Sequence, residues 1–379
     1  MKIGIITMHH VVNFGSALQS YALQHTLHSM GVDSEIIDYR LKKNTKGGTW
    51  LLQAKKQIFI FVKNIVTGFS RYRAEKKFNC FRMQHLKLSA KTYSSDNINK
   101  EKFCYDIYMT GSDQVWNPKH IDNDVNYFLA FAPDECPKIS YASSFATKSL
   151  APNYVQLYSK YLKRYKHISV REKSGVDIVS KMVGEHAIVD CDPVLLVKSK
   201  DWEELSAKSS FKVDYKYILV YALYYMFDPY PQLNRIIEHA RKTLGYRVIY
   251  LNARTREALM SDSSIYKAGG PNEFLYLIKN AELIITTSFH GTAFSAIFDK
   301  PVMGIVKGDE SDDRISSLLI CLNANESIVK YDSCIDSWSK EKILSLRCNQ
   351  DCLRGISDAS KDNLLNSIRI IADDENRRK

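Results

Sequence analysis

A histidine lies where a predicted strand passes into a predicted helix. Residues 283–287 form an apolar, β-branched run, which predicts a buried strand, and the run ends at Ser288-Phe289-His290-Gly291. Ligands bind at this edge of open α/β sheets, and a helix start offers unpaired N–H groups to an anion. Glycine lets the backbone approach a ligand closely. We therefore predict that Ser288, His290 and Gly291 line a binding site, and a histidine that only caps the turn is the alternative.

A second loop with polar side chains follows the predicted strand at 104–109. It places an acid, an amide and an aromatic ring within four residues, at Asp113, Gln114 and Trp116. This mixture suits a sugar, which offers hydroxyls at its edge and C–H groups on its faces. The alternative is a tight loop in which Asp113 caps and Trp116 fills the core.

A third loop follows the strand predicted at 2–7. His9, Asn13 and Gln19 lie in this loop or in the helix expected from about residue 16 to residue 30. Their side chains could hydrogen-bond a sugar-like ligand. Equally, Asn13 and Ser16 could simply build the turn and cap the helix.

Two arginines also follow predicted strands. Arg171 comes directly after residues 167–170, and its planar guanidinium suits a carboxylate or phosphate. The alternative is a surface ion pair with a neighbour such as Glu172. Arg314 ends the sequence S-D-D-R after the strand at 302–306 and could reach the same cleft as His290, although D-D-R is also common at helix starts.

Strands and helices alternate along the chain in two successive cycles, which predicts parallel sheets. We therefore expect an α/β protein with two Rossmann-like domains facing a cleft. Residues 1–200 form the first domain, on the expected acceptor side, with a basic helical insertion at 40–90. Residues 201–362 form the second domain, on the expected donor side, and residues 363–379 form a C-terminal helix and tail.

Basic residues concentrate in one segment of the chain. The net charge is +11, yet residues 40–87 contain a single acid, Glu75, among many lysines and arginines interleaved with aromatic residues. This pattern suits an anionic membrane surface, and nucleic acid is the rival partner. The alternative is a solvated face of helices packed on the domain.

Composition limits the remaining possibilities. The chain is 45% apolar and 25% charged, as in ordinary globular proteins, and its first residues read as a strand rather than a signal peptide. The eight cysteines form no C-x-x-C pair, and the sequence has no Walker or G-x-G-x-x-G motif. We expect no metal site, no cofactor and a cytoplasmic protein.

Several long motifs, in order, resemble those of the polysaccharide pyruvyl transferase family. They are T-M-H-H-V-V-N-F-G-S-A-L-Q-S-Y-A-L, Y-D-I-Y-M-T-G-S-D-Q-V-W-N-P, S-Y-A-S-S-F-A, S-V-R-E-K-S-G, V-D-C-D-P-V-L-L and T-T-S-F-H-G-T-A-F-S-A-I-F-D-K-P. The resemblance extends from about residue 1 to residue 320 and leaves out the basic segment.

The resemblance implies a fold like that of GT-B glycosyltransferases. It also implies transfer of a pyruvyl group from phosphoenolpyruvate, as co-substrate, to two hydroxyls of a sugar, giving a ketal and phosphate. The acceptor would be a cell-surface glycan or its lipid-linked precursor. The family's donor-binding residues would fall on Arg171 and His290, with Arg314 as a further match. Docking at the inner face of the membrane through residues 40–87 would then serve a polyprenyl-linked acceptor.

The chemistry of this reaction assigns roles to the candidates. His290 can protonate the methylene carbon of the donor, or it can only bind phosphate. Asp113 can act as general base or bind an acceptor hydroxyl. The first alternative function is a GT-B glycosyltransferase that uses a nucleotide sugar. A non-catalytic binding protein and a nucleic-acid binder are the second and third alternatives. We predict no nucleic-acid partner.

Overall fold

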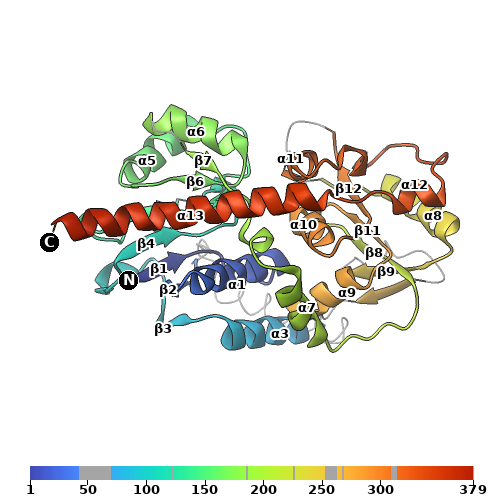
Figure 1. The fold of residues 1–379 in the computed structure, drawn as a ribbon, viewed down its shortest axis with the longest axis horizontal. Helices are drawn as coiled ribbons and strands as arrows, with labels where there is room; N and C mark the ends of the chain where they lie inside the picture. The colour runs from blue at the N-terminus through green and yellow to red at the C-terminus, as the bar shows by residue number, and fades with distance from the viewer. Residues whose placement is uncertain are drawn as a thin grey trace, which may run out of the picture.

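Two parallel sheets form the frame of the protein. A computed structural model describes residues 1–41, 70–121, 123–184, 187–224, 227–251, 263–266, 269–308 and 314–378. In Figure 1 the two sheets lie next to one another with helices packed around them. Every strand pair in this part of the chain is parallel, so the prediction of two Rossmann-like α/β units is confirmed.

The first sheet has the strand order β3-β2-β1-β4-β5. Its strands are β1 (Lys2–Ile6), β2 (Asp33–Tyr39), β3 (Leu88–Tyr93), β4 (Ile107–Thr110) and β5 (Lys138–Ser140). Its helices include α1 (Phe14–Ser29), α3 (Ser70–His85) and α4 (Pro118–Ile121). The order reverses between β1 and β4, and the crevice at the carboxyl ends of such a pair is a ligand site in open sheets.

A small extension of this sheet positions Arg171. It contains α5 (Pro152–Leu162), β6 (Ser169–Val170), α6 (Lys173–Val183) and β7 (Ile188–Val189). Single parallel bridges join Asp113 to Ser143 and Ser143 to Val170. The end of β6 is therefore fixed beside the loop that follows β4.

The second sheet has the strand order β10-β9-β8-β11-β12-β13. Its strands are β8 (Tyr217–Tyr221), β9 (Arg247–Leu251), β10 (Ser263–Tyr266), β11 (Leu283–Thr286), β12 (Val302–Val306) and β13 (Ile328–Lys330). Its helices are α7 (Ser199–Ala207), α8 (Gln232–Leu244), α9 (Pro271–Lys279), α10 (Phe289–Ile297), α11 (Arg314–Cys321) and α12 (Lys340–Leu344). The central strands are fully buried, as their apolar sequences predict.

An aromatic cluster joins the two halves of the molecule, of which the first is built on the sheet that contains β1 and the second on the sheet that contains β8. Phe14, at the start of α1, stacks on Phe274 of α9 with ring centroids 4.8 Å apart. Phe14 also meets Phe78 of α3 and the edge of Tyr221 in β8. All four side chains belong to one buried core, so the start of α1 is anchored against the second half.

The last helix, α13 (Gln350–Arg378), runs along both halves (Figure 1). Ile356 packs against the core that the halves share, whereas Leu364 and Ile368 are buried in the core of the first sheet. The predicted boundary at residue 362 therefore falls inside a continuous helix. Apolar residues at helical spacing, among them Leu364, Ile368 and Ile371, give this helix one buried side.

Candidate active site

The α10 turn places His290 at the carboxyl edge of the second sheet. β11 ends at Thr286, and the Oγ of Ser288 caps α10 by accepting a hydrogen bond from the Gly291 N–H at 3.3 Å. A Cβ on Gly291 would lie 2.4 Å from the Thr286 Oγ1. A glycine is therefore required at position 291 so that α10 can pack closely on the end of β11. This requirement is structural and does not depend on a ligand.

The His290 ring reaches across to the first half of the molecule. A Cβ on Gly15 would lie only 2.0 Å from its Nδ1, so the imidazole lies directly against the first turn of α1. The His290 side chain is 12% exposed, and its Nε2 lies 3.5 Å from the Asp192 Oδ2. The two atoms are close enough for an ion pair, but they do not form a hydrogen bond.

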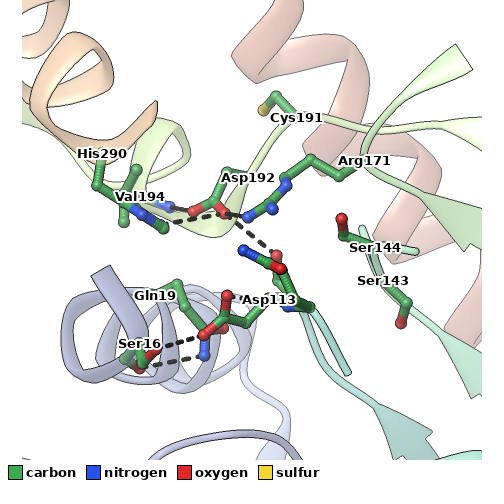
Figure 2. Close-up of polar contacts among 12 residues, drawn as sticks. Ser16, Gln19, Asp113, Ser143, Ser144, Arg171, Cys191, Asp192, Val194 and His290 are labelled. Carbon is green, nitrogen blue, oxygen red and sulfur yellow. Dashed lines mark hydrogen bonds and ion pairs between the residues drawn. The ribbon is translucent and has the colours of Figure 1, made fainter. Parts of the chain in front are cut away.

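Asp192 is the centre of the polar network (Figure 2). Its carboxylate is fully buried and accepts hydrogen bonds from the Arg171 Nη1 at 2.8 Å and the Ser112 Oγ at 3.2 Å. The Val194 N–H donates to its other oxygen at 3.1 Å. Burial alone would raise the pKa of Asp192, but His290 and Arg171 hold that pKa well below its usual range. Asp192 thus remains an anion, held between the Arg171 guanidinium and the His290 imidazole.

Arg171 is buried, so the surface ion pair considered for it is wrong. Its side chain is 3% exposed, and its guanidinium lies 4.7 Å from the centre of the Phe289 ring. Glu172 is also buried and lies 3.9 Å from the Arg171 Nε. The Glu172 Oε1 accepts hydrogen bonds from the N–H groups of Phe145 and Ala146 and from a serine hydroxyl. This network fixes Arg171 at the end of β6.

Asp113 lies on the first half of the molecule, opposite Asp192 in Figure 2. Its backbone has a φ of 80°, which is unusual for a residue other than glycine and stores strain. The carboxylate accepts hydrogen bonds from the Ser16 hydroxyl of α1 and from the Gln114 N–H. The strained turn directs the carboxylate toward α1 and the space beside it.

These side chains surround one pocket between the two halves. Its volume is about 250 Å³, enough for a small anion together with part of a sugar. The lining residues are Met8, Val11, Asn13, Ser16, Asp113, Gln114, His120, Arg171, Leu223, Ser288, Phe289, His290 and Arg314. Seven of the residues chosen from the sequence therefore come together here: Asn13, Asp113, Gln114, Arg171, Ser288, His290 and Arg314.

Three candidate acceptor residues lie elsewhere, fully buried. His9 uses both ring nitrogens within the protein, 3.2 Å from the Thr7 carbonyl and 3.0 Å from Asp38. The Gln19 amide donates to the Thr7 hydroxyl at 2.9 Å. Trp116 fills core and donates from its Nε1 to a carbonyl oxygen at 3.2 Å. The expectation that these three bind an acceptor is corrected, because each is enclosed by protein.

Sequence reasoning missed Asp192 and Ser16. Asp192 appears in the V-D-C-D-P motif, after the short strand β7, where an acid before proline resembles an ordinary turn. Its position after a strand is the same signal that identified Arg171 and His290. Ser16 was read only as a turn or cap residue, and its partner Asp113 is 97 residues away in the chain.

The arrangement can hold a small dianion and move protons. Arg171 and Arg314 supply cationic donors, and α1 and α10 both begin at the pocket, since their capping residues Asn13 and Ser288 line it. His290 adds an imidazole, which can serve as a general acid or a general base. Asp113 lies on the opposite wall as an acceptor of protons or hydroxyl hydrogen bonds.

Comparison with solved structures identifies the fold. The chain is similar to UDP-GlcNAc 2-epimerase from Neisseria meningitidis bound to UDP-GlcNAc, with 12% identity, a TM-score of 0.55 and coverage of 97% of this chain and 99% of that one. The UDP-GlcNAc 2-epimerase from Methanocaldococcus jannaschii is 14% identical, with a TM-score of 0.53 and coverage of 94% and 92%. These likenesses show a GT-B-type fold, as predicted, and at such identities they show the fold alone.

The sequence itself identifies the family. Comparison with curated proteins finds no match. The sequence model of the polysaccharide pyruvyl transferase family matches residues 13–306, which include most of the pocket-lining residues and Asp192. The match spans most of the chain, and the family name implies a transferase that acts on a saccharide. The chain belongs to the polysaccharide pyruvyl transferase family.

Proposed function

We propose that the protein transfers a pyruvyl group from phosphoenolpyruvate to two hydroxyls of one sugar, forming a ketal. One hydroxyl proton ends on the methylene carbon of the donor, which becomes a methyl group, and the other ends on the released phosphate. The sugar belongs to a cell-surface polysaccharide or its lipid-linked precursor. No cofactor beyond the co-substrate is needed for this balance.

One observation carries the proposal: a buried arginine and a histidine, fixed by a shared aspartate, form one wall of a pocket between two domains. Phosphoenolpyruvate has a carboxylate and a phosphate, so its site must supply several cationic or N–H donors. Arg171, Arg314 and the starts of α1 and α10 meet that demand. Because Asp192 offsets part of the Arg171 charge, we expect the helix N-termini and His290 to complete the site.

The pocket also suits the order of bond changes. In our proposal His290 delivers the proton to the methylene carbon, which makes the central carbon electrophilic. A sugar hydroxyl then attacks that carbon, phosphate leaves, and the second hydroxyl closes the ring. Asp113 on the opposite wall accepts the hydroxyl proton, and general acid–base help of this kind is worth about 10²–10⁴-fold.

Phosphate release provides the test. The protein is incubated with phosphoenolpyruvate and a panel of galactose-, glucose- and mannose-terminated acceptors, and products are identified by mass spectrometry. We expect acceptor-dependent phosphate release that disappears in His290→Ala. His28→Ala, which removes an exposed histidine from α1, is the matched control and should behave as wild type.

Calorimetry separates this function from nucleotide-sugar transfer. We expect phosphoenolpyruvate to bind and UDP not to compete with it. Binding of UDP without binding of phosphoenolpyruvate would overturn the proposal in favour of a glycosyltransferase.

We further propose peripheral contact with an anionic membrane. The basic segment lies largely at 42–69, outside the described residues. The described helix α3 carries exposed Tyr72 and Met83 with exposed Arg73 and Lys76, which suits a charged interface. Among the described residues, no helix combines the length and apolarity needed to span a bilayer. Flotation with vesicles tests the contact, and negligible binding with and without anionic lipid would refute it.

A further inference from the structure

A group of basic side chains lies outside the pocket, at the carboxyl end of the first sheet. His10 comes from the loop after β1, Arg40 follows β2, and Arg82 comes from α3. Met8 and Val11, which precede and follow His10 in the same loop, line the pocket. The basic group is therefore adjacent to the side of the pocket formed by the first sheet.

Among the described residues, the positive charges of this group outnumber the carboxylates that contact them. Arg82 donates from its Nη1 to the His10 carbonyl at 3.0 Å and from its Nη2 to an amide oxygen, and it has no carboxylate partner in the described ranges. Arg40 donates from its Nη2 to Asp38 at 3.2 Å. The same carboxylate is shared with His9, 3.0 Å away. Asp38 is thus shared by one guanidinium group and one imidazole, while Arg82 has only neutral hydrogen-bond partners among the described residues.

Burial is the main cause of a lowered pKa at His10, and the neighbouring positive charges add to it. Burial and the charges of His9, Arg82 and Arg40 together lower the pKa of His10 to about 4, against the opposing effect of Asp38. Burial and Arg40 also lower the pKa of Arg82. An anion placed among these side chains would relieve their mutual repulsion.

We propose that His10, Arg40 and Arg82 bind a phosphate group carried by the saccharide acceptor. Guanidinium forks match the oxygens of phosphate, and a ring N–H of His10 can add a further donor. The Arg40 side chain is 56% exposed, so it is free to turn toward a ligand without unfolding the loop. This inference rests on the proposed function, because it names the class of acceptor for the adjacent pocket.

Acceptors that differ only in phosphate test the site. One sugar is supplied as methyl glycoside, as glycosyl methyl phosphodiester and as a short-chain prenyl diphosphate. We expect the wild-type KM to be about tenfold lower for a phosphate-bearing acceptor, as a charge-assisted hydrogen bond would give. The phosphodiester represents a phosphate within a glycan, and the prenyl diphosphate represents a lipid carrier, so the better of the two identifies the source.

Variants then locate the effect. Arg40→Gln and Arg82→Gln should each reduce the KM ratio between the methyl glycoside and the phosphate-bearing acceptor toward one. Lys181→Gln removes an exposed charge from α6, in the same half of the molecule, and should keep the ratio. Equal wild-type KM values for all three acceptors would overturn the site.

A direct binding measurement keeps this inference separate from the proposed function. The His10 imidazole is followed by NMR in inorganic phosphate and in NaCl of equal ionic strength, with His10→Gln to assign the signal. We expect phosphate, but not NaCl, to raise the pKa of His10 from about 4. An unchanged titration would overturn the anion site even if pyruvyl transfer is observed. If no acceptor is pyruvylated, the proposed function fails while this measurement still tests the site.

Discussion

Two of the histidine–aspartate pairs in the described part of this protein have opposite surroundings. His9 is fully buried, 3.0 Å from Asp38, and its second ring nitrogen lies 3.2 Å from a backbone carbonyl. His290 lies 3.5 Å from Asp192 at the wall of the pocket, and its aspartate also holds Arg171. The first imidazole is enclosed by protein and the second can be reached by a ligand. Pairing with a carboxylate therefore does not by itself mark a reactive histidine, and access decides.

Removing the imidazole of His290 gives the largest expected loss. His290→Ala should lower kcat by about 10²–10⁴-fold, because it removes the proposed proton donor. The free energy of unfolding should also fall, by about 1–3 kcal/mol, because the ring packs against α1 and lies 3.5 Å from the buried Asp192. Phosphate-release kinetics and urea unfolding measure the two quantities. Activity within twofold of wild type would show that His290 resembles His9 in being structural.

Displacing the same ring without removing it should have the next largest effect. Gly15→Ala introduces a Cβ that would lie 2.0 Å from the His290 Nδ1, so the ring must move. A shift of about 1 Å in a catalytic group can reduce the rate about 10²-fold. Gly355→Ala, where a Cβ meets nothing within 4 Å, is the control. Equal kcat values for the two variants would mean that the ring position is unimportant.

Substitutions of Asp38 and Asp192 should both change stability, but only the substitution of Asp192 should change activity. The pKa values of Asp38 and Asp192 are both lowered in the fold, despite burial, by hydrogen bonds and neighbouring charges. Their stabilisation is therefore complete above the unfolded pKa of about 3.9 and is lost as pH falls through the lower folded values. Asp38→Asn and Asp192→Asn should each weaken this acid dependence of urea unfolding. Only Asp192→Asn should reduce turnover of a methyl glycoside at pH 7, and an equal reduction in both would remove the distinction.

The smallest effects are expected for Gln114 and Trp116, which are close in sequence but differ in whether a ligand can reach them. Gln114 lines the pocket, whereas Trp116 is buried and donates to a carbonyl oxygen at 3.2 Å. Gln114→Ala should raise the acceptor KM with little change in stability. Trp116→Phe should lower the free energy of unfolding by about 1–2 kcal/mol and leave KM unchanged. An increase in acceptor KM for Trp116→Phe alone would contradict the assignment of Trp116 to the core.

The sequence was informative where parallel strands end. Arg171, Asp113 and His290 each follow a strand, and because such ends meet at one edge of a sheet, their convergence could be predicted. Edge strands were harder to detect: β3 is half exposed along most of its length, so it lacks the apolar run that marked central strands. The interior strands of both sheets could be predicted because they are buried and therefore have continuous apolar sequences.

Side-chain direction could not be predicted in the same way. Residue type made His9, Gln19 and Trp116 good sugar binders, but their orientation depends on how distant helices and strands pack. The role of Asp192 was hidden for a related reason. Its partners Arg171 and His290 come from different halves of the chain, and only the assembled fold brings them within 4 Å of one carboxylate.

The path of α13 has a mechanical consequence. The chain passes between the halves twice, once after β7 and again in α13, whose Asn363 donates to Asp190 at 2.9 Å. Two bodies linked covalently at two separate points turn most easily about the line through those points. Opening of the pocket should therefore follow a single hinge axis, and the second attachment lies two residues from Asp192. Rotation about that axis would open the pocket and change the distance between Arg171 and His290 at the same time. Substrate entry and the alignment of these two side chains would then occur in one movement.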